Sequence, residues 1–211
     1  MKVRVSLFLA LIAILSACAD NNAINNADLV GVNNLAEVTG PPESRPMSGS
    51  AQSLAIESDL LPAGCVENAP GVERPNSGVA EARSDGAEYL AASQRVDGWQ
   101  IQFDCPGNPG LIVNVVATYA TLEGAAITLS RRWHGEVWER LDAGTLEQLD
   151  PMPGLGDLQI VFQDANGTIG VEFVYRSSYF FLTGTNVGGA DNYEFFSTLA
   201  NEYLAEIKSL N

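Results

Sequence analysis

The stretch "WQIQFDCPGNPGLIVNVVATY", residues 99–119, decides the fold class. Its first six residues alternate between apolar and polar side chains, as in a strand that buries one face. The prolines and glycines of 105–110 predict a loop. The β-branched run 111–119 then predicts a central strand that is covered on both faces. The apolar residues of the alternating segment are Trp99, Ile101 and Phe103.

A short helix is predicted before these strands, over 84–94, with Ser84 or Asp85 as its cap. The residues that follow, 96–98, read Val-Asp-Gly and predict a turn into the first strand. The helix would present one apolar face, formed by Ala87, Leu90 and Ala91.

A longer helix is predicted after the strands, over 121–141, with Thr121 as its N-cap. Apolar residues recur there at three- and four-residue steps and form one stripe, the side that a helix buries. The prolines and glycines of 150–157 end this pattern. The stripe consists of Leu122, Ala125, Ala126, Leu129, Trp133, Val137 and Leu141.

Three antiparallel strands are predicted next, over 157–163, 169–176 and 179–185. Asn166 and Gly167 between the first two are a strong hairpin signal. The aromatic residues of these elements mostly lie on inward faces, so we expect them to pack in the core. On the last strand, Phe180 lies on the opposite face from Tyr179 and Phe181. The other aromatic residues considered are Trp99, Trp133, Trp138 and Tyr175.

A last helix begins after Asp191, which can cap it, with Glu194 three residues later in the position that reaches back to the cap. The whole pattern predicts an α+β fold, a mostly antiparallel sheet of about five strands with the mid-chain and C-terminal helices packed on it. The apolar face of the last helix consists of Tyr193, Phe196, Leu199, Tyr203, Ile207 and Leu210.

The chain begins with an export signal. Lys2 and Arg4 precede a short apolar stretch that ends in small residues, and the stretch is too short to span a bilayer. The tetrapeptide Leu-Ser-Ala-Cys at 15–18 resembles the bacterial lipobox. That resemblance implies cleavage before Cys18 and a lipid on its sulfur, which would anchor the protein to a membrane outside the cytoplasm, at the outer membrane or the outer face of the cytoplasmic membrane.

The exported chain divides into a linker and a domain. Residues 18–58 are rich in Asn, Ser, Gly and Pro without a helix or strand period, so we expect a flexible tether. Residues 59–211 are predicted to form a single domain. Removing residues 1–17 takes away two positive charges and lowers the formal net charge from −15 to −17. This charge argues against nucleic acid as a partner, because phosphate binding needs Lys and Arg.

Two cysteines remain after Cys18, namely Cys65 and Cys105. In an oxidising compartment they are expected to form a structural disulfide, with two separate buried thiols as the alternative. They lie too far apart in the sequence for a redox Cys-x-x-Cys motif.

Catalytic and metal groupings are scarce. His134 is the only histidine, and its place on the long helix predicts a surface residue rather than a catalytic base. A zinc cluster is lacking, and Asp164, Asn166 and Thr168 are better explained by a hairpin turn than by a calcium loop. No cofactor is expected. Catalytic carboxylates are left open, because acidic residues are plentiful and their separation in space is not readable.

The segments around the deciding stretch also resemble a group of exported bacterial proteins. The shared segments are "EYLAASQRVDGWQIQFD", "LIVNVVATYATLEGA", "GLGDLQIVF" and "FFSTLANEYLAEI". These motifs are structural, and no catalytic role is attached to them. The layout is also similar to the PsbP/Mog1 class of α+β sandwiches, which implies an assembly or binding factor.

We therefore expect a lipid-anchored, non-enzymatic module that binds a protein or a small molecule. A carboxylate-based hydrolase of the cell envelope and a purely structural envelope component are the alternatives. Converging carboxylates with raised pKa values in a cleft would favour the enzyme.

Overall fold

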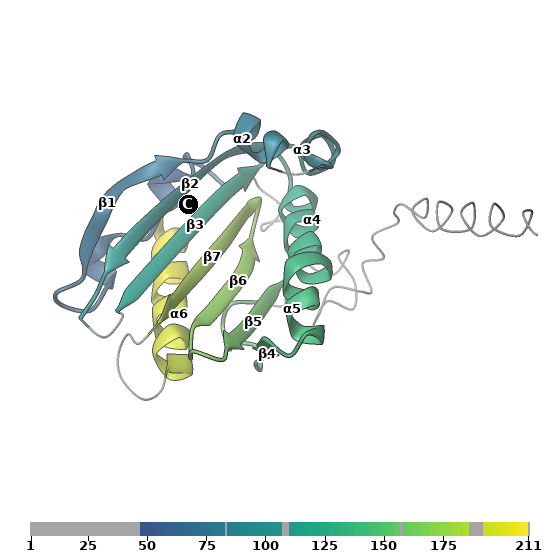
Figure 1. The fold of residues 1–211 in the computed structure, drawn as a ribbon. Helices are drawn as coiled ribbons and strands as arrows, with labels where there is room; N and C mark the ends of the chain where they lie inside the picture. Colours follow the sequence, from purple (N-terminus) through teal and green to yellow (C-terminus); the bar gives the residue numbers. More distant parts are fainter. Residues whose placement is uncertain (1–46, 83, 107–109, 157, 186–191, 211) are drawn as a thin grey trace, which may run out of the picture.

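The computed structural model describes residues 47–82, 84–106, 110–156, 158–185 and 192–210. These residues form a seven-stranded antiparallel sheet with helices on both faces (Figure 1). The predicted α+β class is confirmed, with seven strands instead of about five. In spatial order the strands are β1 (Val66–Glu73), β2 (Arg95–Asp104), β3 (Leu111–Tyr119), β7 (Ser178–Thr185), β6 (Ile169–Tyr175), β5 (Gln159–Asp164) and β4 (Leu146–Gln148).

The two additional strands, β1 and β4, lie at the two edges of the sheet. β1 contains Pro70 and Gly71, is mostly exposed and is paired irregularly with β2. β4 is only three residues long. Edge strands tolerate proline and need not alternate, so neither segment carries a strand pattern of its own.

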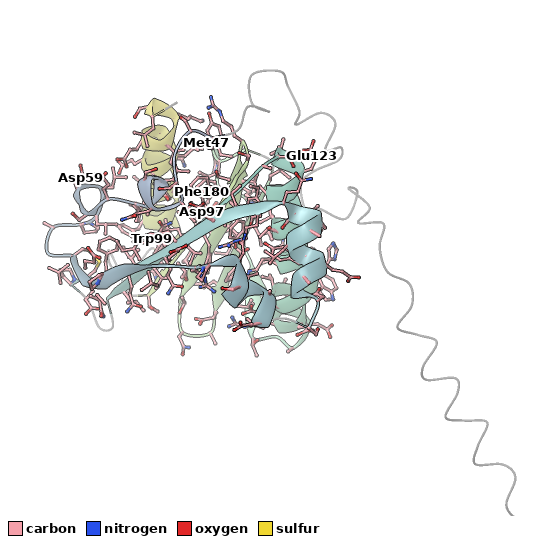
Figure 2. All side chains as sticks on the ribbon, turned by 90° about the horizontal axis from the view of Figure 1, so that it is seen from above. Met47, Asp59, Asp97, Trp99, Glu123 and Phe180 are labelled. Carbon is pink, nitrogen blue, oxygen red and sulfur yellow. A yellow bond between two sulfur atoms is a disulfide. The ribbon has the colours of Figure 1, made fainter. Side chains whose placement is uncertain are left out.

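One face of the sheet is covered by α6 (Asn192–Ser209) and by residues 47–61, which we call the N-terminal strap. The strap contains two short 3₁₀ turns, η2 (Gln52–Leu54) and η3 (Ser58–Leu60). Seen from above, the strap with Met47 and Asp59 lies on the same side of the sheet as α6 (Figure 2). Phe180 points to this face and is completely buried against α6, and the predicted cap of α6, Asp191, lies outside the described residues.

The strap is part of the domain, so the predicted boundary at residue 58 is corrected. Leu54 and Ile56 are each 2% exposed. The Ile56 amide donates to Asn114 Oδ1 at 3.0 Å, and the Tyr203 hydroxyl of α6 donates to the Leu54 carbonyl at 2.5 Å. The domain therefore begins no later than Met47. The apolar side chains of the strap are buried, and its backbone forms hydrogen bonds with the sheet and with α6.

The other face is covered in part by the mid-chain helix. It begins as α4 (Leu122–Arg132), passes through a π-helical turn, η4 (Trp133–Val137), and ends as α5 (Trp138–Asp142). Thr121 caps it as predicted, and its side chain accepts from the Gly124 amide at 3.1 Å. The predicted stripe is buried through Val137. Trp138, in contrast, is 53% exposed.

Two small helices join β1 to β2, namely α2 (Asn76–Glu81) and α3 (Gly86–Ser93). The short helix was predicted, but its inward face was wrong, because Tyr89 is buried while Ala87 and Ala91 are exposed. The predicted turn at 96–98 is also wrong. Those residues belong to β2, with an irregularity in pairing that directs Asp97 to the Ala51 amide of the strap.

Two predicted local features are confirmed. Cys65 and Cys105 form a disulfide that joins the start of β1 to the end of β2. Asp164 Oδ1 accepts from the Asn166 and Thr168 amides at 2.8 and 2.9 Å and so closes the β5–β6 hairpin turn. These hydrogen bonds lower the pKa of Asp164 although burial opposes them.

Candidate ligand-binding cleft

A cleft of about 690 Å³ opens on the sheet face that α4 covers only in part. In Figure 1, α4 and α5 stand on the β5 side of the sheet, and α2 and α3 lie at its upper end. The floor is formed by β2, β3 and β7, one wall by α4, and the other wall by the end of β1 and by α2.

The floor of the cleft is apolar. Val113 and Val115 of β3 point into it and are only half-buried. They pair across the sheet with Thr183 and Phe181 of β7. The prediction that this strand is covered on both faces therefore holds for the α6 face and is wrong for the middle of the opposite face. In this part of β3, the apolar side chains line the cleft and do not pack in the core.

The α4 wall carries Arg132, which binds a completely buried carboxylate, Glu172 of β6. The guanidinium donates to Glu172 through Nη2 at 2.7 Å and Nε at 3.1 Å, and it also pairs with Glu136. The Tyr179 hydroxyl donates to the second Glu172 oxygen at 2.7 Å. Burial alone would lower the pKa of Arg132, but Tyr179 and Glu172 outweigh burial and raise it, so the cation is permanent.

Three hydroxyl groups meet beside this wall, those of Tyr89, Tyr119 and Thr128. The hydroxyl oxygens of Tyr89 and Thr128 lie 2.8 Å apart, and the Thr128 hydroxyl donates to the Tyr119 hydroxyl at 2.8 Å. Burial raises the pKa of Tyr119, so the Tyr119 hydroxyl stays uncharged at neutral pH. Arg131 stacks over the Tyr89 ring at 5.3 Å and pairs with Asp85, which was predicted to serve as a helix cap.

The opposite wall carries two further arginines. Arg95 is 8% exposed and donates to Asn76 Oδ1 and, at 2.8 Å, to the carbonyl of Arg74. Arg74 is exposed and donates to Gln100 Oε1 at 2.6 Å. These contacts join the end of β1, the start of α2 and β2 into one polar wall.

The cleft thus gathers four arginines, Arg74, Arg95, Arg131 and Arg132, of the eleven Lys and Arg residues in a chain with a net charge of −15. The acidic residues that line it are Glu73 and Glu136. Such an arrangement can hold an uncharged or anionic molecule on an apolar floor.

The residues considered from the sequence lie elsewhere. His134 is exposed and does not line the cleft. The carboxyl group of Glu206 has a raised pKa because of its burial and of nearby Glu57 and Asp59, but these residues belong to α6 and the strap, across the sheet from the cleft. Cys18 lies outside the described residues. Within the described residues, no group of three or more His, Cys, Asp or Glu side chains could hold a metal ion.

The arginines of the cleft, and Tyr89 and Tyr119, were missed from the sequence, whereas Tyr179 and Phe181 were considered and expected to pack in the core. Glu172 offered the clearest signal, because a charged residue stands in the apolar strand "IGVEFVY" of 169–175. A polar side chain on the second face of such a strand indicates that this face is exposed to solvent or that the side chain has a buried partner. In the structure the partner is Arg132, which is distant in the sequence. The other side chains converge only through strand pairing and helix placement.

No model of a known protein family matches the chain, and no curated protein sequence matches it. Among solved structures, the chain is similar to the extracellular domain of PknH from Mycobacterium tuberculosis, with a TM-score of 0.47 and 9% sequence identity. The match covers 77% of this chain and 99% of that one.

Proposed function

We propose that this protein is a lipid-anchored binding module that works outside the cytoplasm and holds a small molecule in the cleft between α4 and β2. The cleft is the observation that carries this function. Its volume of about 690 Å³ lies within the range of roughly 300–1,000 Å³ that is usual for small-molecule sites. An apolar floor with a few polar groups along the walls is also typical of such sites.

Two features support the location. The lipobox ending in Cys18 supports export and lipid anchoring. The disulfide between Cys65 and Cys105 is expected in an oxidising compartment and rare in the cytoplasm. Within the described part of the chain, none of the helices is both long and apolar enough to cross a membrane.

The contacts inside the cleft favour binding over carboxylate-based hydrolysis. A hydrolase of that kind needs two carboxyl groups that face the substrate from the two sides of the scissile bond. Glu136, which lines the cleft on the α4 side, is paired with Arg132. Glu172 is completely buried, and its oxygens are occupied by Arg132 and Tyr179. A purely structural component would not require an open cleft with an apolar floor.

The test uses the uncharged fluorescent probe N-phenyl-1-naphthylamine, which brightens in apolar sites. We expect saturable, one-to-one binding to the exported protein. In Val115→Trp the indole would occupy the floor of the cleft, so affinity should fall by about tenfold or more, equivalent to about 1.4 kcal/mol.

Val96→Trp is the matched control, because Val96 is 61% exposed on β2 and does not line the cleft. It should bind the probe as the wild type does. Circular dichroism and thermal melting of both variants would show that each is folded. Equal binding by the wild type and a folded Val115→Trp protein would refute the cleft as the binding site.

A further inference from the structure

The charges along the cleft are not all matched within the protein. Arg131 pairs with Asp85, and Arg132 pairs with Glu172 and Glu136. Arg74 and Arg95 differ, because their contacts within the described residues are with neutral oxygen atoms only. Among the described residues, the two arginines on the α2 side therefore form no ion pair.

The burial of Arg95 makes this feature significant. A buried cation is costly unless an anion or a full set of acceptors compensates it. Arg95 is 8% exposed, and its acceptors are the side-chain oxygen of Asn76 and the carbonyl of Arg74. These acceptors occupy two of its five N–H groups, and Arg95 lines the cleft.

The neighbouring groups do not supply the missing negative charge. Asp97, two residues away, accepts from the Ala51 amide and from Thr118 and is thereby bound to the strap side. The Tyr119 hydroxyl is close enough to Arg95 to interact electrostatically, but burial raises its pKa and keeps it neutral. Glu73 lines the cleft without forming an ion pair with either arginine among the described residues.

We propose that the cleft takes an amphiphilic anion, an apolar molecule with one carboxylate or phosphate group. This inference rests on the proposed function and specifies its ligand. The anionic group binds between Arg74 and Arg95, where charge-assisted hydrogen bonds from guanidinium groups hold carboxylates and phosphates well. The apolar body lies on Val113 and Val115 and reaches toward the Phe181 ring. The negative surface of the rest of the chain repels anions, so the arginines in the cleft provide the local attraction.

The test compares two probes that differ in one group. 1-Anilinonaphthalene-8-sulfonate is N-phenyl-1-naphthylamine with an added sulfonate, so the pair isolates the contribution of the negative charge. We expect the anionic probe to bind about tenfold or more tightly than the neutral one at low salt, the size expected for a hydrogen bond between charged groups. Its advantage should decrease as salt is added, because Arg74 is exposed.

Arg74→Gln should remove most of that advantage, measured as the ratio of the affinities of the two probes for the same variant. Because Arg74 is exposed, this variant should keep its fold. Arg140→Gln changes the net charge equally at α5, outside the cleft, and should behave as the wild type. Arg95→Gln should weaken the anionic probe further, and Arg95→Lys should restore part of the affinity. Melting temperatures would report whether either Arg95 variant is unstable.

Competition with simple amphiphiles identifies the head group. Decanoate and decyl phosphate should each displace the anionic probe, and the stronger of the two reveals whether a carboxylate or a phosphate is preferred. Decyltrimethylammonium has the same chain with a positive head and should displace it poorly.

The outcomes separate the two proposals. If the neutral probe binds in the cleft but the sulfonate adds no affinity, or Arg74→Gln and Arg140→Gln behave alike, the anion proposal is wrong and the binding module stands. If neither probe is affected by Val115→Trp, the proposed function fails as well.

Discussion

At the scale of single residues, the least expected feature is the charged pair within the sheet layer. Glu172 is completely buried, and both of its oxygens accept hydrogen bonds, one from Arg132 and one from Tyr179. A buried carboxylate is tolerated when it is paired and fully hydrogen-bonded. The same contacts hold the Arg132 side chain at the cleft wall, with its guanidinium 5.6 Å from the centre of the Phe181 ring.

Replacing either acidic partner of Arg132 should therefore have very different effects. Glu172→Gln leaves the guanidinium without its buried counter-charge and should lower the free energy of unfolding by about 2–3 kcal/mol. Glu136→Gln removes the exposed partner, whose side chain is 62% accessible, and should cost less than about 1 kcal/mol. Urea denaturation at neutral pH measures both values. Similar losses in the two variants would contradict the assigned role of Glu172.

At the scale of elements, β3 serves both faces of the sheet with one alternating pattern. Val113 and Val115 form the floor of the cleft. Asn114 between them is completely buried on the other face. Its side chain accepts a hydrogen bond from the Ile56 amide and donates one to the Phe181 carbonyl at 3.3 Å. Residues of opposite character can stand next to each other because successive side chains of a strand point to opposite faces. The N-terminal strap is consequently held by the central strand as well as by α6.

The strap should contribute to stability like any other core element. Leu54→Ala creates a cavity beside α6 and should lower the free energy of unfolding by about 2–4 kcal/mol. Gln52→Ala in the same 3₁₀ turn changes an exposed side chain and should cost less than about 0.5 kcal/mol. Both are measured by denaturant unfolding of the full exported chain. A negligible loss in Leu54→Ala would restore the tether boundary to residue 58.

At the scale of the whole molecule, the proposed binding module combines three parts: a lipid anchor, a polar linker and a domain with one arginine-rich hollow. The disulfide ties the first edge strand to β2 at the end of the strand pair that is opposite to Arg74 and Arg95. In this proposal, the arginines of the cleft attract the anion locally, although the net charge of −15 repels anions from the molecule as a whole.

The anchor is tested by examining the amino terminus of the mature protein. We expect mass spectrometry to find Cys18 as the first residue, carrying acyl chains, because two or more chains are needed for stable attachment. Cys18→Ser should release the protein from the membrane fraction, whereas Cys65→Ser, which breaks only the disulfide, should leave it attached. A mature terminus at another residue, or an unmodified Cys18, would refute lipid anchoring.

The sequence by itself determined the features that depend on neighbours along the chain. Alternation identified β2, β5 and β6, a β-branched run identified β3, Thr121 marked the start of α4, and Asn166 with Gly167 marked the hairpin. These signals are readable because a period of two or 3.6 residues, a cap or a tight turn acts over a few consecutive residues. The pairing of Cys65 with Cys105 was expected because lipidation of Cys18 would leave two cysteines, and the structure contains this disulfide.

Only the tertiary structure decided the edge strands, the strap and the cleft. β1 is a strand because β2 offers it hydrogen bonds, and residues 47–58 are ordered because the sheet and α6 present partners to them. The cleft brings Arg74 and Arg95 opposite Arg131 and Arg132 although the two pairs come from separate parts of the chain. The physical reason is that strand pairing and helix placement set these distances, and neither is determined by the residues that are brought together.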